Sequence, residues 1–426
     1  MSSVYRVKPI TGPLNAVVRP PGSKSITNRA LVCAALAEGT SRLTGALDSD
    51  DTRVMIEGLA GLGIGVERSN NHTLVVTGCD GQIPAMEADL LVGNSGTTVR
   101  FLTAMLTLGH GAFRLSGVPR MHERPIGDLA AALNQLGAKV SCESPGGCPP
   151  VTIHANGLPG GSATVRGEIS SQFLSGLLMA APCARDAVEL AVEGELVSKP
   201  YVAMTLAVMR EFGVEAVVDP TMQNFSIRPQ SYQARDYAIE PDASAASYFW
   251  AAAAIVGGRV QVDGLSPNSL QGDVRFVDCL ETMGCRVERG GDYLAVESHE
   301  LRGAVLDMND ISDTAQTLAA VALFAEGPTT ITGIGHNRHK ESDRIGDLAR
   351  ELRKLGAEVA EHEDGFTVTP DQVAPSEIET YDDHRMAMSM ALVGLRVPGV
   401  VILDPGCTSK TYPRFFEDLD RLKSGA

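Results

Sequence analysis

Two short segments in the last third of the chain concentrate ionisable side chains. Residues 339–344 read His-Lys-Glu-Ser-Asp-Arg, and residues 381–385 read Tyr-Asp-Asp-His-Arg directly before an apolar run. Asp313 stands at the start of another apolar run. A run of charges is ordinarily a solvated face, but Lys, Arg and His beside carboxylates can also tune one another for acid–base chemistry. These segments alone leave both interpretations open.

Three further segments combine small or hydroxyl residues with the expected start of a helix. Residues 21–29 (PGSKSITNR) precede an expected helix at 30–36, and residues 93–100 (GNSGTTVR) precede one at 101–106. Residues 169–174 (ISSQFL) are a third polar helix start. Free backbone N–H groups at a helix start can bind an anion. Each segment alone is therefore either a capped surface helix or part of an anion-binding site.

Metal ions and nucleotide cofactors lack a matching pattern. The spacings of His336, His339 and His384 fit no standard zinc site. The 21–29 segment lacks the GxxxxGK[ST] spacing of a nucleotide-binding loop, and no GxGxxG segment follows an expected strand. We therefore expect no metal and no cofactor.

The elements that must position these residues recur along the chain. Six short alternating strands each run into a glycine, and these glycines lie 72, 77, 70, 69 and 73 residues apart. Five helix ends also meet a glycine before a strand, at intervals of 74, 76, 71 and 72 residues. The strand glycines are Gly45, Gly117, Gly194, Gly264, Gly333 and Gly406, and the helix glycines are Gly63, Gly137, Gly213, Gly284 and Gly356. The pattern predicts six α/β units of roughly seventy residues each.

The sixth unit lacks its own last strand, because the chain ends just after an expected helix at 415–422. We expect residues 5–9 to supply that strand. The first residues and the last third then belong to one domain, and the middle of the chain is inserted between them. Pro-containing crossings at 19–22 and 239–242 mark the two boundaries.

The expected domains follow from these crossings. Residues 1–21 and 241–426 should form a discontinuous domain of three α/β repeats, and residues 22–240 should form an inserted domain of three more. We expect the active site in the cleft between them.

The composition is that of an ordinary globular protein, with 44% hydrophobic and 21% charged residues among 426. The net charge of −16 argues against nucleic-acid and membrane partners, which are themselves negative. It does not argue against a small anionic substrate. No apolar run is long enough for a transmembrane helix, and the start lacks a secretory signal. Because the eight cysteines form no CxxC pair, we expect reduced thiols and a cytoplasmic location.

In this order the motifs form a specific set. The chain resembles the 5-enolpyruvylshikimate-3-phosphate synthases, a family of enolpyruvyl transferases, over nearly its full length. The segments that carry the resemblance are PGSKSITNR at 21–29, GNSGTTVR at 93–100, RMHERPIG at 120–127, ISSQFL at 169–174, LVSKPY at 196–201, the Asp313 region, KESDR at 340–344, DDHRMAM at 382–388 and CTSKTYP at 407–413.

The resemblance implies a two-domain α/β (α+β) fold, with three α/β units per domain, helices inside and sheets outside. It implies transfer of the enolpyruvyl (1-carboxyvinyl) group of phosphoenolpyruvate to the 5-hydroxyl of shikimate 3-phosphate, with release of phosphate. That reaction belongs to the shikimate pathway, which leads to chorismate and the aromatic amino acids. Glyphosate is the implied inhibitor, and we expect a monomer.

The resemblance also implies roles for individual residues. Those implied to contact shikimate 3-phosphate are Lys24, Ser25, Arg29, Ser170, Ser171, Gln172, Ser198, Tyr201, Asp313 and Lys340. Those implied to contact phosphoenolpyruvate are Lys24, Gly96, Thr97, Arg124, Gln172, Glu341, Arg344, Arg385 and Lys410. The implied catalytic residues are Asp313, Glu341 and Lys24.

The chemistry accounts for these residue types. The 5-hydroxyl adds to C2 of phosphoenolpyruvate while C3 gains a proton, and the tetrahedral adduct then loses phosphate and a C3 proton. One acid–base group must serve C3 and another the hydroxyl; we expect Glu341 at C3 and Asp313 at the hydroxyl. Because both substrates are multiply anionic, several cations are needed to bring them together.

Some positions depart from the commoner family pattern. Ser95 and Thr98 stand where alanine is frequent, and Phe101 stands where one branch carries proline. His336, with Asn337 beside it, stands where an asparagine is expected. Whether His336 or Asn337 contacts substrate is left open.

Two alternative functions differ from this expectation. The related transferase that acts on UDP-N-acetylglucosamine usually carries Asn after the first Lys and a Cys or Asp in a mobile loop, whereas here Ser25 follows Lys24 and residues 117–124 contain no Cys. A catalytically inactive, anion-binding homologue would lack an acid, a base or a key Arg, and none is missing. Gly96, which has no side chain, predicts sensitivity to glyphosate.

Overall fold

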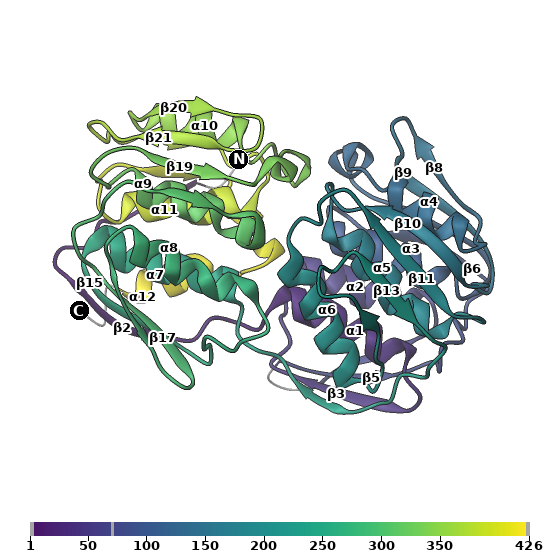
Figure 1. Cartoon of the computed structure of the whole chain (residues 1–426). Helices are drawn as coiled ribbons and strands as arrows, with labels where there is room; N and C mark the ends of the chain where they lie inside the picture. Colours follow the sequence, from purple (N-terminus) through teal and green to yellow (C-terminus); the bar gives the residue numbers. More distant parts are fainter. Residues whose placement is uncertain (1–3, 70–71, 423–426) are drawn as a thin grey trace. The chain divides into compact units, whose positions relative to one another are not determined.

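The structure is a computed structural model that describes residues 4–69 and 72–422. The chain divides into two compact units. Unit 1 comprises Met1–Pro21 and Glu240–Ala426, and unit 2 comprises Gly22–Ile239. Within each unit, helices lie on the inside and sheets on the outside (Figure 1).

The described strands of unit 2 form three sheets with one plan. In each, the first strand pairs in parallel with the second, and the second, third and fourth pair antiparallel in turn. In spatial order the sheets are β14 (Asp236–Ala238), β3 (Thr40–Thr44), β5 (Thr73–Thr77) and β4 (Gly65–Ser69); β6 (Glu87–Leu91), β7 (His110–Ser116), β9 (Cys148–Asn156) and β8 (Val140–Ser144); and β10 (Gly161–Arg166), β11 (Val188–Glu193), β13 (Asn224–Ile227) and β12 (Val217–Val218).

Two sheets of unit 1 repeat this plan in full, and the third repeats its first three strands among the described residues. Its sheets are β2 (Leu14–Val18), β15 (Gly258–Asp263), β17 (Tyr293–Glu297) and β16 (Arg286–Arg289); β18 (Val305–Asp307), β19 (Thr329–Thr332), β21 (Phe366–Thr369) and β20 (Glu358–Glu361); and β22 (Glu377–Ile378), β23 (Val401–Leu403) and β1 (Val4–Arg6). The repeated topology confirms the six α/β units predicted from the spacing of the glycines.

Each repeat contributes two helices. The first helices are α1 (Lys24–Leu36), α3 (Gly96–Leu106) and α5 (Ser171–Ala180) in unit 2, and α7 (Ala243–Val256), α9 (Ala315–Ala322) and α11 (His384–Gly394) in unit 1. The second helices are α2 (Asp50–Gly61), α4 (Gly127–Gln135), α6 (Lys199–Glu211), α8 (Phe276–Thr282), α10 (Gly346–Lys354) and α12 (Phe415–Arg421). Every residue of α3, α9 and α11 is buried, as expected for helices surrounded by other elements.

Two of the inner helices begin earlier than the sequence predicted. We expected helices at 30–36 and 101–106, but α1 begins at Lys24 and α3 at Gly96. The reason is capping: the Ser23 side chain accepts from the Ile26 N–H, and the Ser95 side chain accepts from the Thr98 N–H. The motif residues therefore form the first turns of the helices instead of a loop ahead of them.

The helix-ending glycines adopt the left-handed conformation that the sequence predicted. Gly63, after α2, has a φ of +81°, and Gly356, after α10, has a φ of +99°. The three equivalent glycines, at 137, 213 and 284, also have positive φ. This conformation carries little penalty only for glycine, so the pattern marks each junction from helix to strand.

The N-terminal segment completes the sixth repeat. Val4–Arg6 pairs antiparallel with β23, which confirms the prediction that the start of the chain supplies the missing strand. The Tyr5 ring packs on Phe416 with centroids 4.2 Å apart, and its hydroxyl donates to Asp420 at 2.7 Å. The first strand is thus fixed to the last helix.

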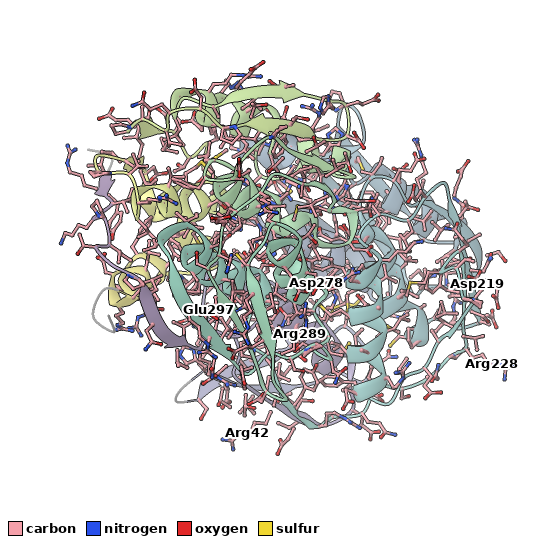
Figure 2. The ribbon with its side chains drawn as sticks, turned by 60° about the vertical axis from the view of Figure 1, so that its left-hand side comes forward. Arg42, Asp219, Arg228, Asp278, Arg289 and Glu297 are labelled. Atoms are coloured by element: carbon pink, nitrogen blue, oxygen red, sulfur yellow. The ribbon has the colours of Figure 1, made fainter. Side chains whose placement is uncertain are left out.

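Ion pairs on the surface add little to this framework. Arg289 in β16 donates to Asp278 in α8 at 2.7 Å, and both side chains are labelled in Figure 2. Exposed pairs of this kind contribute about 0–1 kcal/mol, so apolar burial by the inner helices is the larger stabilising term. Within the described residues, no helix combines the length and the apolar character needed to cross a membrane.

Candidate active site

Asp313 accepts from three cations in unit 1. It lies in a 3₁₀ helix, Asn309–Thr314, directly before α9. Its Oδ1 accepts from Lys340 Nζ and from Arg344 Nη1, both at 3.3 Å, and its Oδ2 accepts from Arg385 Nη2 at 2.7 Å. The carboxylate that the sequence singled out is therefore surrounded by positive charge.

Glu341 is bound by two cations of the same unit. Its Oε1 accepts from Lys410 Nζ at 2.8 Å, and its Oε2 accepts from Arg344 Nη2 at 2.8 Å. Its side chain is 9% exposed. Because Arg344 also binds Asp313, a single guanidinium connects the two carboxylates expected to transfer protons.

Asp383 is the third carboxylate of this group. It caps α11 by accepting from the Arg385 N–H at 2.9 Å, and it accepts from Arg344 Nε at 2.7 Å and from the Ser342 hydroxyl at 2.9 Å. Burial alone would raise the pKa of Asp383, but the neighbouring groups, first among them Arg344, together outweigh burial and the pKa is lowered. Burial alone would likewise lower the pKa of Arg344, but Asp383, Glu341 and Asp313 together outweigh it and the pKa is raised.

We call these seven residues the acid–base cluster. Four cations face three carboxylates, which leaves one positive charge in excess. Such a surplus suits a site that receives an anionic ligand. The members are Asp313, Lys340, Glu341, Arg344, Asp383, Arg385 and Lys410.

His336 and Asn337 both bind Ser312, the residue before Asp313. His336 Nε2 lies 2.9 Å from the Ser312 hydroxyl, and Asn337 Nδ2 donates to the Ser312 carbonyl at 2.9 Å. Burial, with Lys340 as the next cause, lowers the pKa of His336 to about 3, so the ring is neutral near pH 7. Both side chains brace the segment that carries Asp313.

His384 is the first residue of α11 and is buried. Burial lowers the pKa of His384 well below its usual value, and neither ring nitrogen has a hydrogen-bond partner among the described residues. In the part of the chain that the structure describes, no group of three or more His, Cys, Asp or Glu could hold a metal ion. All eight cysteines are free.

In unit 2, Arg29 lies at the centre of a second group of predicted residues. Nε donates to the Thr205 hydroxyl at 2.7 Å, Nη1 to the Ser25 carbonyl at 2.9 Å and Nη2 to the Tyr201 carbonyl at 3.2 Å. The guanidinium also lies 5.2 Å from the centre of the Phe101 ring. Because Arg29 is 2% exposed, burial lowers its pKa to about 10, against an opposing contribution from Tyr201. Arg29 thus holds Ser25 and Tyr201, two residues predicted to bind the same ligand.

Two further arginines surround the start of α3. Arg100 Nη1 donates to Gln172 Oε1 at 2.8 Å and to the Gly96 carbonyl at 3.3 Å. Arg124 Nη1 donates to the Asn94 carbonyl at 2.9 Å and to Asn94 Oδ1 at 3.1 Å. A Cβ on Gly96 would lie 2.5 Å from Arg124 Nη2 and 2.6 Å from Arg100 Nη1, so only glycine fits between them without displacing a guanidinium.

The starts of the unit 2 helices carry neutral caps. Ser23, Ser95 and Ser170 cap α1, α3 and α5 with their hydroxyls. Serine satisfies one N–H without adding negative charge, so the positive end of the helix dipole stays available to an anion. Unit 1 differs, because carboxylates cap α7 and α11. Of the remaining predicted residues, Lys24, Thr97 and Ser171 lie in the first turns of α1, α3 and α5, and Ser198 directly precedes α6.

Comparison with known proteins shows a single family over nearly the whole chain. The family model described as EPSP synthase (3-phosphoshikimate 1-carboxyvinyltransferase) matches residues 8–419. The chain belongs to the EPSP synthase family. The resemblance stated from the motifs is therefore confirmed.

Individual relatives agree with the family match. The 3-phosphoshikimate 1-carboxyvinyltransferase of Nostoc punctiforme is 49% identical over 416 residues, covering 96% of this chain and 97% of that protein. The enzyme of the same name from a Shewanella species is 50% identical over 408 residues, covering 95% and 96%. A solved EPSP synthase from Acinetobacter baumannii superposes with a TM-score of 0.81 at 27% identity, covering 98% of each chain. These matches confirm the enolpyruvyl transferase fold and do not favour the UDP-N-acetylglucosamine alternative.

The site residues predicted from the EPSP synthase motifs fall into two groups. The residues in unit 1 are joined by hydrogen bonds and ion pairs within the acid–base cluster. We call the unit 2 residues the helix-start group, because they lie at or near the starts of its helices. Its members are Lys24, Ser25, Arg29, Gly96, Thr97, Arg124, Ser170, Ser171, Gln172, Ser198 and Tyr201.

Sequence reasoning missed three residues that hold predicted ones. Asp383 binds Arg344, Arg100 binds Gln172, and Asn94 binds Arg124. All three lie inside EPSP synthase motifs that the sequence analysis quoted. For Asp383 a further signal was present, because an acidic residue directly before an apolar helix is a typical N-cap.

Proposed function

We propose that the chain transfers the enolpyruvyl group of phosphoenolpyruvate to the 5-hydroxyl of shikimate 3-phosphate and releases phosphate. The observation that carries this proposal is the placement of Asp313 and Glu341 on one guanidinium, that of Arg344, at 3.3 and 2.8 Å. The reaction needs two acid–base groups close together in a cationic setting. The acid–base cluster has this combination, and the chain belongs to a family named for this activity.

The two carboxylates have separate tasks in this proposal. Asp313 accepts the proton of the 5-hydroxyl as its oxygen bonds to C2 of phosphoenolpyruvate, and Glu341 donates a proton to C3. In the second half, Glu341 takes a C3 proton back while the C2–O bond to phosphate breaks, and the released phosphate takes the hydroxyl proton held by Asp313, so both carboxyl groups return to their starting states. Lys24 is assigned as the third catalytic residue, and Lys340, Arg344, Arg385 and Lys410 offset the charge of the ligands.

Both units contribute to substrate binding in this proposal. The helix-start group of unit 2, Gly22–Ile239, binds shikimate 3-phosphate through serine hydroxyls, Gln172 and Arg29, and it adds Gly96, Thr97 and Arg124 for phosphoenolpyruvate. The acid–base cluster of unit 1, Met1–Pro21 with Glu240–Ala426, supplies Asp313 and Lys340 to the acceptor and the other cations to the donor. Neutral serine caps in unit 2 and carboxylates in unit 1 support this division between anion binding and proton transfer.

Four finer assignments accompany this function. Glyphosate inhibits by competing with phosphoenolpyruvate, and Gly96 supports its binding because it carries no side chain. The protein acts as a monomer in the cytoplasm. It needs no nucleic-acid or membrane partner, which the net charge of −16 supports.

A phosphate-release assay tests the function. Purified protein is given phosphoenolpyruvate with shikimate 3-phosphate, with UDP-N-acetylglucosamine or with no acceptor. Release only with shikimate 3-phosphate is expected. Release with the UDP-sugar would transfer the assignment to the related enzyme, and no release with either acceptor would favour an inactive homologue.

A further inference from the structure

The turn that leads into α11 is conformationally strained. Tyr381 and Asp382 both adopt the left-handed region, with φ of +54° and +53°. Neither residue is a glycine, and this conformation is unfavourable for both. Such strain persists only where surrounding contacts hold it, and it is frequent at functional sites. The next residue is Asp383, the carboxylate that binds Arg344.

A buried carboxylate on α10 holds this turn. The Tyr381 hydroxyl donates to Glu351 Oε1 at 2.7 Å. Glu351 is 0% exposed, and its other oxygen accepts from the Glu379 N–H at 3.1 Å and from Lys354 Nζ at 2.9 Å. The Arg350 guanidinium lies 5.6 Å from the centre of the Tyr381 ring. Two consecutive residues of α10 therefore contact Tyr381, one at its hydroxyl and the other at its ring.

Burying a carboxylate is unfavourable unless every contact is well made. Glu351 is on a helix whose neighbours Leu348, Ala349 and Leu352 already supply apolar packing. An apolar residue at position 351 would serve that packing equally well. What Glu351 adds is the acceptor for the Tyr381 hydroxyl and for the backbone just ahead of the turn.

The same helix also fixes the partner of Asp383. Arg344 lies two residues before the first residue of α10, and Tyr381 lies two residues before Asp383. These residues form a closed ring of connections. Arg344 leads into α10, Glu351 of α10 accepts from Tyr381, and Tyr381 is followed two residues later by Asp383. Asp383 Oδ2 in turn accepts from Arg344 Nε at 2.7 Å. Loss of the hydrogen bond between Glu351 and Tyr381 would therefore displace Asp383 relative to Arg344, because Tyr381 is only two residues from Asp383.

We propose that Glu351 and Tyr381 are positioning residues that hold the strained turn. Held in this way, Asp383 keeps Arg344 in place through their ion pair and fixes the start of α11, which carries Arg385. Both arginines are then positioned to bind the anionic donor. This inference rests on the proposed function, in which Arg344 and Arg385 bind phosphoenolpyruvate. Neither Glu351 nor Tyr381 is required to touch a substrate.

The test compares Tyr381→Phe with wild type. This change removes only the hydroxyl and keeps the ring beside Arg350. Tyr5→Phe is the matched control, because the Tyr5 hydroxyl makes an equally short 2.7 Å bond to Asp420 in the same unit, and neither residue belongs to the acid–base cluster. The kcat and the KM for each substrate are measured by phosphate release, and thermal unfolding reports the folded state.

The KM for phosphoenolpyruvate is expected to rise roughly tenfold or more in Tyr381→Phe, because small displacements of binding groups have effects of this size. The KM for shikimate 3-phosphate should change much less, and Tyr5→Phe should leave both constants unchanged. A merely structural role would lower the active fraction, and so kcat, without separating the two KM values. An unchanged donor KM, or equal changes in both, overturns the proposal. An inactive wild type would instead refute the proposed function.

A second substitution tests the strain directly. In the Tyr381→Phe background, Asp382→Gly should recover part of the lost donor affinity, because glycine adopts the left-handed conformation without penalty. If the donor affinity does not recover, strain in the turn is not what connects Tyr381 to donor binding. If Tyr381→Phe does not fold, Glu351→Gln is measured in its place. A donor-specific rise in KM is again expected, and an unchanged donor KM overturns the proposal.

Discussion

Asp383 and Arg344 form an ion pair that is almost completely removed from solvent. Arg344 Nε donates to Asp383 Oδ2 at 2.7 Å, and the two side chains are 2% and 0% exposed. A second nitrogen of Arg344, Nη2, reaches the other oxygen of Asp383 at 3.2 Å. The pair fixes the guanidinium on one side and leaves Nη1 and Nη2 directed at Asp313 and Glu341.

Asp383→Asn should destabilise the fold strongly. Removing this carboxylate raises the positive excess of the acid–base cluster from one charge to two, and breaking a buried ion pair typically costs about 3–5 kcal/mol. The free energy of unfolding from urea denaturation measures the loss. Asp278→Asn is the control, because its pair with Arg289 is on the surface and should contribute less than about 1 kcal/mol. Equal losses of unfolding free energy in the two variants would show that the buried pair stabilises the fold no more than the exposed pair does.

Glu341→Gln should keep substrate binding and lose most turnover. The amide still accepts a hydrogen bond but cannot cycle a proton, and general acid–base groups typically contribute ~10²–10⁴-fold. The kcat from phosphate release measures the effect. Glu361→Gln, which removes an exposed partner of Arg353, should leave kcat unchanged. A kcat for Glu341→Gln close to that of wild type would remove Glu341 from proton transfer.

Gly96→Ala should weaken both glyphosate and phosphoenolpyruvate. The added methyl would meet Arg124 at 2.5 Å and Arg100 at 2.6 Å, so it displaces a predicted donor ligand as well as narrowing the space for the longer inhibitor. The glyphosate inhibition constant should rise by a larger factor than the donor KM. The control is Gly291→Ala, whose methyl would meet nothing within 4 Å. An unchanged donor KM would show that Arg124 moves aside without consequence.

His336 should make stability depend on pH below neutrality. Burial lowers its pKa to about 3 from the usual 6.5, with Lys340 as the next cause and Asp313 opposing. Between these values the unfolded chain binds a proton that the folded chain does not, so stability is complete above pH 6.5 and falls as the pH falls. One such group contributes about 1.4 kcal/mol per pH unit.

His336→Gln removes this titration. The loss in unfolding free energy between pH 7 and pH 5 should therefore be about 2 kcal/mol smaller in the variant than in wild type. His384, whose pKa is also lowered by burial, titrates alike in both proteins. His362→Gln, at an exposed histidine 3.0 Å from the Thr367 hydroxyl, should keep the wild-type slope. Identical slopes for wild type and His336→Gln would show that His336 does not carry the effect.

Local rules were enough to predict the repeats of the fold from the sequence. Alternating strands that end at glycine, and helices closed by a left-handed glycine such as Gly63 or Gly356, depend on neighbouring residues only. The prediction that the first strand completes the sixth repeat followed from counting these units. The starts of α1 and α3 were predicted too late, because the caps Ser23 and Ser95 draw the polar motif residues into the helix.

For the candidate site, the sequence by itself determined the residue types and the family, because the motifs are short and contiguous. Only the tertiary structure decided the partners. Arg344 binds Asp313, 31 residues earlier, and Asp383, 39 residues later. The residues adjacent to each of these three in sequence do not determine that they come into contact. It is set by the packing of the inner helices α9 and α11, which brings their starts together and removes the charges from water. Burial then determines which charges must pair, since an isolated one would be too costly to keep.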